Sequence, residues 1–242
     1  MVVTPQRERG SRTAPRAVAG LRREEIAIPV RGGEIVGDLA VPPGAIGTVV
    51  FAHGSGSGRF SPRNRSVAAD LEAAGIATLL LDLLTGPEAE VDEETRQYRF
   101  DIPRLAGRLT DAIDLVGARG PTAGKPAGLY GASTGGAAAL ITAASRPEAV
   151  RALVLRGARS DLAGPAASKV LAPTLFLVGE LDPIVRDLNE ATRSEMPGPT
   201  ELVVVPGASH LFEEPGALEE VSRRSRDWFL RHLPAAVPPS SP

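Results

Sequence analysis

The sequence predicts an α/β protein built on one mostly parallel, twisted sheet of about eight strands, with helices on both faces. Short apolar runs rich in β-branched residues alternate along the chain with segments of helical periodicity, which is typical of βαβ units. Several of these runs are apolar throughout, as expected for strands covered on both faces. The 242 residues are 43% hydrophobic, which is enough for one sizeable core, and we expect a single domain.

The order of the elements follows from the turn residues and the apolar periodicity. Residues 24–30 and 33–41 predict an antiparallel hairpin, because Arg-Gly-Gly supplies the turn between them. Six further strands are expected at residues 47–54, 77–84, 127–133, 151–157, 174–182 and 200–207. Helices are expected at residues 63–74, 92–116, 134–145, 162–170, 185–196 and 215–233. Within the second helix, Pro103 predicts a kink or a restart.

The two ends of the chain are predicted to lie outside the folded domain, which we place at residues 24–233. Residues 1–23 mix arginine, proline and glycine without a continuous apolar stretch, which favours a disordered basic arm over a secretory signal. Residues 234–242 contain four prolines and predict a disordered tail. No run is long and apolar enough to cross a bilayer, so we expect a cytoplasmic protein with no membrane partner.

The charge and the cysteine content narrow the class of function. Lys and Arg number 27 against 29 Asp and Glu, so the net charge of −2 gives no reason to expect a nucleic-acid partner. Cysteine is absent, which excludes thiolate chemistry, and we expect no metal or organic cofactor. We expect a small-molecule substrate and a monomer or homodimer. Only three histidines could transfer protons, His53, His210 and His232.

A candidate nucleophile lies in the stretch Gly131-Ala132-Ser133-Thr134-Gly135. Small residues on both sides of Ser133, with a strand before and an alanine-rich helix after, are typical of a sharp turn that presents a nucleophile. The helix N-terminus would also favour negative charge that develops at the serine. The alternative is a helix cap in a closely packed region.

His210 is the candidate general base, because it follows the last predicted strand and so lies at the same edge of the sheet as Ser133. His53 ends an early strand among glycines, and His232 lies at the end of the last helix. Asp182, at the end of the strand predicted at 174–182, is the candidate acid that orients His210, with Glu180 and Asp187 as competitors.

The oxyanion hole requires two backbone donors that point at one position. The amide of Thr134 is one candidate, and the amide of Ser55 is the other. Gly54 would allow the backbone of the loop that carries Ser55 to approach closely, and His53 would shape this loop by hydrogen bonds. A phosphate-binding loop is the competing interpretation, but the spacing of the glycines does not match one.

Together the stretches FAHGSGSG, GASTGG, GELDPIV and GASHLFEEPG resemble the α/β-hydrolase fold, and more narrowly its dienelactone-hydrolase-like branch of small bacterial hydrolases. The resemblance covers about residues 26–233. It implies that Ser133 is the nucleophile, Asp182 the acid and His210 the base, with Ser55 and Thr134 at the oxyanion positions. Dienelactone hydrolases proper use a cysteine nucleophile, which this chain lacks, so ordinary ester hydrolysis is expected instead.

Other residues are candidates for contact with the substrate. Only residues 158–173 separate two strands where many relatives of this fold insert a cap, so no sizeable cap domain is expected. The connection at residues 84–100 could form a partial cover, with Tyr98 and Phe100 as pocket walls or as anchors of the following helix. Arg156 and Arg159 could bind an anionic group of the substrate or form structural ion pairs, for example with Asp161.

The sequence thus predicts a serine hydrolase that cleaves carboxylic esters of small to medium acyl groups, or lactones, through an acyl-enzyme on Ser133. Two alternatives remain open. One is a catalytically retired scaffold that binds a ligand or a partner, since a fold does not fix a function. The other is an acyltransferase that uses the same three residues.

Overall fold

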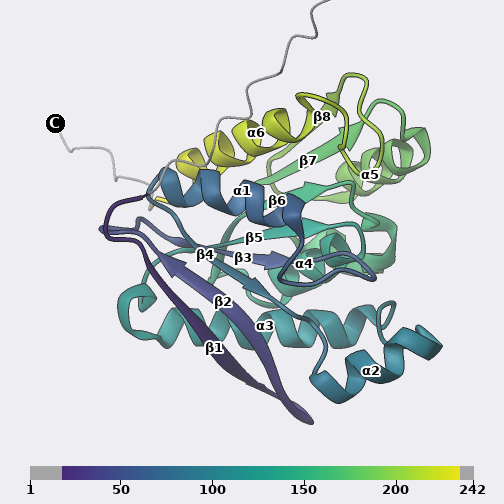
Figure 1. Ribbon diagram of the computed structural model, residues 1–242. Helices are drawn as coiled ribbons and strands as arrows, with labels where there is room; N and C mark the ends of the chain where they lie inside the picture. The colour runs from purple at the N-terminus through teal and green to yellow at the C-terminus, as the bar shows by residue number, and fades with distance from the viewer. Residues whose placement is uncertain (1–17, 235–242) are drawn as a thin grey trace, which may run out of the picture.

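The protein folds around one eight-stranded sheet with the order β1-β2-β4-β3-β5-β6-β7-β8, seen in a computed structural model that describes residues 18–234 (Figure 1). The strands are β1 Arg22–Val30, β2 Gly33–Val41, β3 Thr48–Ala52, β4 Ala77–Leu81, β5 Ala127–Ala132, β6 Val150–Arg156, β7 Thr174–Gly179 and β8 Thr200–Val205. β1 and β2 form the predicted hairpin, β2 joins β4 antiparallel, and the strands from β4 to β8 are parallel. The predicted fold class is confirmed.

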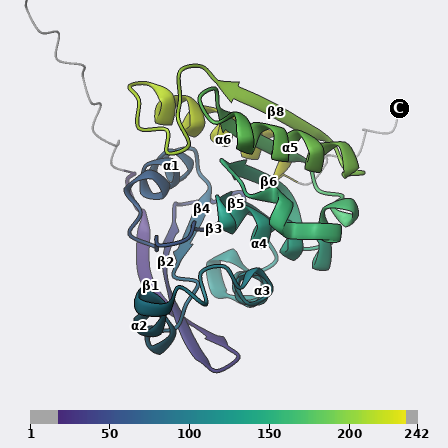
Figure 2. The same cartoon turned by 90° about the vertical axis from the view of Figure 1, so that its right-hand side faces the viewer.

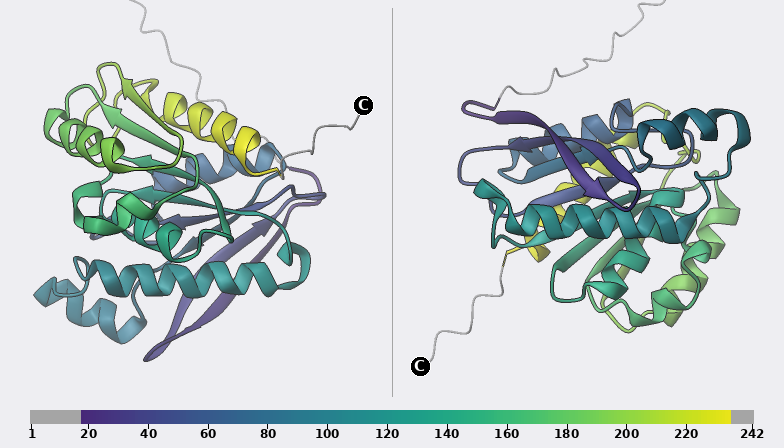
Figure 3. Two further views of the ribbon diagram at one scale, coloured as in Figure 1. Left: turned by 180° about the vertical axis from the view of Figure 1, so that it is seen from behind. Right: turned by 90° about the horizontal axis from the view of Figure 1, so that it is seen from below.

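Helices cover both faces of the sheet, as the views from behind and from below show (Figure 3). The helical elements are α1 Pro62–Ala73, α2 Gly86–Thr95, α3 Ile102–Ala118, η1 Gly120–Thr122, α4 Thr134–Ser145, η2 Ser160–Lys169, α5 Pro183–Glu195 and α6 Ala217–His232. One face packs against α1 and α6, and the other against α3 and α4. The strands β3, β4, β5 and β7 are buried at every position, because both of their faces are covered.

The helix predicted at residues 92–116 is wrong as a single element, because the chain forms two helices there. α2 ends at Arg96, whose backbone is left-handed with φ 58°. α3 restarts at the N-cap Asp101, whose side chain accepts a hydrogen bond from the Arg104 amide at 3.2 Å. Pro103 lies in the first turn of α3, where its missing amide costs no hydrogen bond, so it marks a restart rather than a kink. The weak helix predicted at 162–170 is the 3-10 segment η2.

The described part of the chain begins just before β1 and ends just after α6 (Figure 2). β1 begins at Arg22, so the last two residues of the predicted arm belong to the sheet. The rest of that arm up to residue 17, and the predicted tail from residue 235, lie outside the described residues. In the part of the chain that is described, none of the helices combines the length and the apolar character that crossing a bilayer requires.

Candidate active site

Ser133 occupies a sharp turn between β5 and α4. Its backbone has φ 50° and ψ −120°, one of three positive φ angles among the non-glycine residues described. Such a conformation is strained for a residue with a Cβ and persists only where its surroundings hold it. Here the Ser133 amide donates to the Arg156 carbonyl at 3.1 Å, and its carbonyl accepts from the Arg159 amide at 3.1 Å. The end of β6 therefore fixes the turn that presents Ser133.

Close packing of backbones explains the glycine at position 135. A Cβ added to Gly135 would lie 2.5 Å from the carbonyl oxygen of His53 and would overlap that of Ala52. No side chain fits there, because the obstacle is backbone rather than a mobile side chain. Gly135 thus lets α4 begin directly against the loop that follows β3.

His210 and Asp182 are joined by a hydrogen bond. His210 Nδ1 lies 2.6 Å from Asp182 Oδ2, although the two residues come from the loops after β8 and β7. The predicted competitors have other partners: Glu180 accepts from the Gly207 amide at 2.7 Å, and Asp187 lies on the surface beside Arg186. With Nδ1 bound to a carboxylate, Nε2 of His210 is the nitrogen that remains for proton transfer.

Ser133 and His210 line the same pocket, of about 240 Å³. Its other walls come from the loop after β3, the start of α1 and the end of β6, and they include Gly54, Ser55, Ser61, Arg63, Asn64, Arg156 and Leu211. The structure therefore brings together the predicted nucleophile, base and acid at the carboxyl edge of the sheet, where parallel strands place their ligands. We call this cavity the serine pocket.

The loop after β3 lies alongside Ser133 and is fixed by His53. A Cβ on Gly54 would lie 3.1 Å from the Ser133 Cβ, which places the Gly54–Ser55 segment beside Ser133. His53 Nδ1 lies 2.8 Å from the Gly54 carbonyl, and its Nε2 accepts from the Leu83 amide at 3.0 Å. Burial lowers the pKa of His53, more than the Gly54 carbonyl and Asp82 raise it. The neutral His53 ring thus links this loop to the segment that follows β4, because each ring nitrogen is hydrogen-bonded to a backbone group.

A second pocket, of about 320 Å³, lies on the other side of that loop, and we call it the α2 pocket. It is lined by Ser55, Leu84, Ala89, Leu105 and Thr134, together with charged side chains of residues 84–101, which we call the α2 connection. Leu84 and Ala89 come from the connection that was predicted to form a partial cover.

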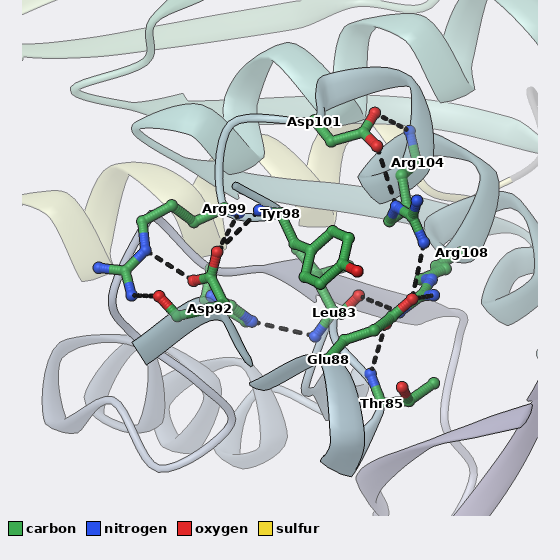
Figure 4. Close-up of polar contacts among 10 residues, drawn as sticks. Leu83, Thr85, Glu88, Asp92, Tyr98, Arg99, Asp101, Arg104 and Arg108 are labelled. Atoms are coloured by element: carbon green, nitrogen blue, oxygen red, sulfur yellow. Dashed lines mark hydrogen bonds and ion pairs between the residues drawn. The ribbon is translucent and has the colours of Figure 1, made fainter. Parts of the chain in front are cut away.

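Ion pairs hold the α2 connection in place (Figure 4). Glu88 binds Arg108 of α3 through both of its oxygens, and its Oε1 also lies 2.7 Å from Arg104 Nη1. Burial disfavours the Glu88 carboxylate, but hydrogen bonds from Arg108 and the Thr85 amide outweigh this and lower its pKa to about 2.

A second carboxylate holds the end of the α2 connection. Asp92 is buried and accepts from the amides of Tyr98 and Arg99 at 2.8 and 2.9 Å and from Arg99 Nε at 2.6 Å (Figure 4). These bonds close the turn between α2 and α3. The α2 connection is therefore fixed in place by these hydrogen bonds and ion pairs.

Neither of the two aromatic candidates lines the serine pocket or the α2 pocket, and of the two arginine candidates only Arg156 lines the serine pocket. The ring of Tyr98 stacks on Arg104 at 4.7 Å and is not among the residues that line either pocket, and Phe100 is 55% exposed. This placement matches the alternative in which Tyr98 anchors the following helix. Arg159 pairs with Asp161 at 2.7 Å, as in the structural alternative, whereas Arg156 is buried and faces the serine pocket.

Sequence reasoning missed the contribution of α1 to the site. Ser61, Arg63 and Asn64 line the serine pocket, and Ser61 is the N-cap of α1. The signal was present, since Ser61-Pro62 is a helix-start pattern that precedes the predicted helix by a single residue. No cluster of three or more His, Asp or Glu side chains arranged to hold a metal ion occurs within residues 18–234.

The chain belongs to the α/β-hydrolase family, because the sequence profile of the α/β hydrolase domain matches residues 45–226. A crystal structure described as dienelactone hydrolase from Anabaena variabilis is 49% identical in sequence, with a TM-score of 0.86, over 88% of this chain and 99% of that one.

Two curated relatives from Mycobacterium tuberculosis, of strains CDC 1551 and H37Rv, are each 50% identical over 213 residues and carry the provisional name phosphoribosyl transferase. The alignment covers 88% of this chain, but the chain spans only about half, 47%, of the length of these relatives. The structure of Est1E from Butyrivibrio proteoclasticus, 16% identical with a TM-score of 0.71 over 86% of this chain and 98% of its own, shares the fold.

Proposed function

We propose that the protein is a carboxylic ester hydrolase that works through an acyl-enzyme on Ser133. The observation that carries this proposal is the serine pocket, in which a strained serine and an imidazole bound to a carboxylate at 2.6 Å face the same cavity. A serine hydroxyl requires an adjacent base to become nucleophilic, and the base requires an acceptor to fix its tautomer. The similarity to a dienelactone hydrolase supports the same class of reaction.

The proposed reaction has two steps. Ser133 Oγ attacks the ester carbonyl carbon while His210 Nε2 takes its proton, and the amides of Ser55 and Thr134 stabilise the oxyanion. The carbon–oxygen bond to the alcohol then breaks, and His210 returns the proton to the leaving oxygen. Water, deprotonated by His210, attacks the acyl carbon, the bond to Ser133 Oγ breaks as His210 returns that proton to this oxygen, and the acid leaves.

The two pockets suggest where the halves of the ester lie. His210 must touch the leaving oxygen, so the alcohol half occupies the serine pocket, which His210 lines. The α2 pocket contains Thr134 and the apolar side chains of Leu84 and Leu105, which suits a small to medium acyl group.

An organophosphonate and a panel of p-nitrophenyl esters test the proposal. Wild-type protein is expected to release a burst of p-nitrophenol and to carry the phosphonate on Ser133, because the acyl-enzyme forms before water attacks. Ser133→Ala is expected to lower kcat by at least about 10³-fold. Hydrolysis by Ser133→Ala at the wild-type rate, or active protein unlabelled at Ser133, contradicts the mechanism.

The acyltransferase alternative uses the same acyl-enzyme, and it predicts that an added alcohol or peroxide captures the acyl group in preference to water. The retired-scaffold alternative predicts thermal stabilisation by a ligand without any hydrolysis. The mycobacterial relatives carry a provisional name for a different activity, that of a phosphoribosyl transferase. We assign a phosphoribosyl transferase activity to the part of those proteins that this chain does not span, so the isolated chain is expected to lack it.

A further inference from the structure

The guanidinium of Arg156 lies inside the serine pocket with few partners. Arg156 is the last residue of β6 and is 7% exposed. Its Nη2 donates to Asn64 Oδ1 at 3.3 Å, which is a long hydrogen bond, and its Nε has no partner among the described residues. The ring of Phe212 lies 5.8 Å from the guanidinium carbon, but a ring supplies no balancing charge.

No anionic side chain in the described part of the chain balances this charge. None of the ion pairs formed within residues 18–234 includes Arg156, although Arg159, three residues further along the chain, is paired with Asp161. Burial raises the pKa of the neighbouring Tyr130, despite the opposing effect of Arg156, so that phenol stays neutral. A buried cation without a counter-charge is costly, and its presence in a substrate pocket indicates that the counter-charge arrives with the ligand.

The start of α1 adds positive potential to the same wall. The N-cap Ser61 and the helix residues Arg63 and Asn64 line the pocket, so the positive end of the dipole of this twelve-residue helix lies at the wall that Arg156 also lines. Arg63 Nη1 lies 2.8 Å from Glu213, whose side chain is 63% exposed, while Arg63 Nε has no partner in the described region. The solvent-exposed Glu213 therefore offsets Arg63 at the rim, and Arg156 remains unbalanced inside.

We propose that the natural substrate is an ester whose alcohol half carries an oxyanion group, a carboxylate or a phosphate, which Arg156 and the start of α1 bind. This rests on the proposed function, because it uses His210 to place the leaving alcohol in the serine pocket. Arg156 is thus a specificity-determining residue. It selects the alcohol half, whereas the α2 pocket selects the acyl half.

Esters that share one acyl group test this assignment. Their alcohol halves are matched in length and end in a carboxylate, a phosphate or a neutral amide. Wild-type kcat/KM is expected to be about 10- to 100-fold higher for an anionic ester than for the neutral one, because the bond to Arg156 is charge-assisted. Arg156→Gln is expected to remove this preference, mainly by raising KM for the anionic esters. Arg159→Gln, the matched control, is expected to keep it. The better of the two anionic esters identifies the anion.

Two results overturn the assignment: equal wild-type kcat/KM for charged and neutral esters, or an undiminished preference in Arg156→Gln. Ser133→Ala protein, which keeps Arg156, provides a measurement that does not require the Arg156 variant to fold. It is expected to bind the anionic ester at least about tenfold more tightly than its neutral match by calorimetry, and equal affinity contradicts the proposal. If no ester is hydrolysed but this difference in affinity persists, the hydrolase mechanism fails while the anion site stands.

Discussion

The turn that carries Ser133 and the α2 connection both border the candidate site, but different forces hold them. The turn is fixed by backbone, since Gly135 lies against the carbonyls of Ala52 and His53 and the Ser133 amide bonds to β6. The α2 connection is fixed by charge, through Glu88 with Arg104 and Arg108 and through Asp92 with Arg99. The position of Ser133 therefore depends on close packing, which tolerates no change in volume, whereas the wall of the neighbouring pocket depends on ionisation.

The same substitution in the two regions gives the largest expected contrast. Gly135→Ala is expected to cost about 3 kcal/mol or more in the free energy of unfolding and to abolish ester hydrolysis, because its Cβ would overlap backbone atoms. Gly86→Ala in α2 is expected to change stability by less than about 1 kcal/mol, because a Cβ there meets nothing within 4 Å. Urea unfolding of both variants measures the difference, and similar losses in the two would break the comparison.

Removal of one charge should affect the α2 connection and leave the turn intact. Glu88→Gln is expected to destabilise this region by about 2 kcal/mol, because the buried Arg108 loses its anionic partner. Limited proteolysis is expected to cut residues 84–101 faster, while phosphonate labelling of Ser133 continues. Glu94→Gln, at an exposed position of the same helix, is the control and should behave as wild type. Equal protection of residues 84–101 in both variants would show that the ion pairs do not hold the connection.

The smallest expected effect is the dependence of the same region on acid. The pKa of Glu88 is about 2 in the folded protein, below its usual value of 4.5. Its contribution to stability is therefore fully present above pH 4.5 and is lost as the pH falls through about 2. The rate of pepsin cleavage at residues 84–101 is expected to differ between wild type and Glu88→Gln at pH 4.5 and to converge near pH 2. If the ratio of the two cleavage rates stayed constant between pH 4.5 and pH 2, the protection of the α2 connection would not depend on the ionisation of Glu88.

The two regions also differ in how far the sequence predicts them. The turn around Ser133 is a local pattern of small residues between a strand and a helix, so both its place and its shape follow from adjacent positions. The Asp182–His210 contact was predictable for a related reason, because each residue follows a strand of the same parallel sheet.

The α2 connection was predicted poorly, because its partners are distant in sequence. The break between α2 and α3 depends on the left-handed Arg96 and on the cap made by Asp101, which helical periodicity alone does not reveal. Glu88 and Arg108 are 20 positions apart, and nothing in either segment marks them as a pair. The sequence also does not predict that Arg156 lacks an anionic partner, because this depends on how far the acidic side chains lie from it in the folded protein.

The sheet order has a consequence for how the protein would lose activity. Asp182 and His210 follow β7 and β8, and β8 is one of the two edge strands of the described sheet, bonded to β7 alone and only partly covered along most of its length. Ser133 follows β5, which has β3 and β6 on its two sides. Unfolding that began at this edge would move the His210 imidazole away while the Ser133 hydroxyl kept its place, so the proposed ester hydrolysis would stop while most of the sheet was still folded.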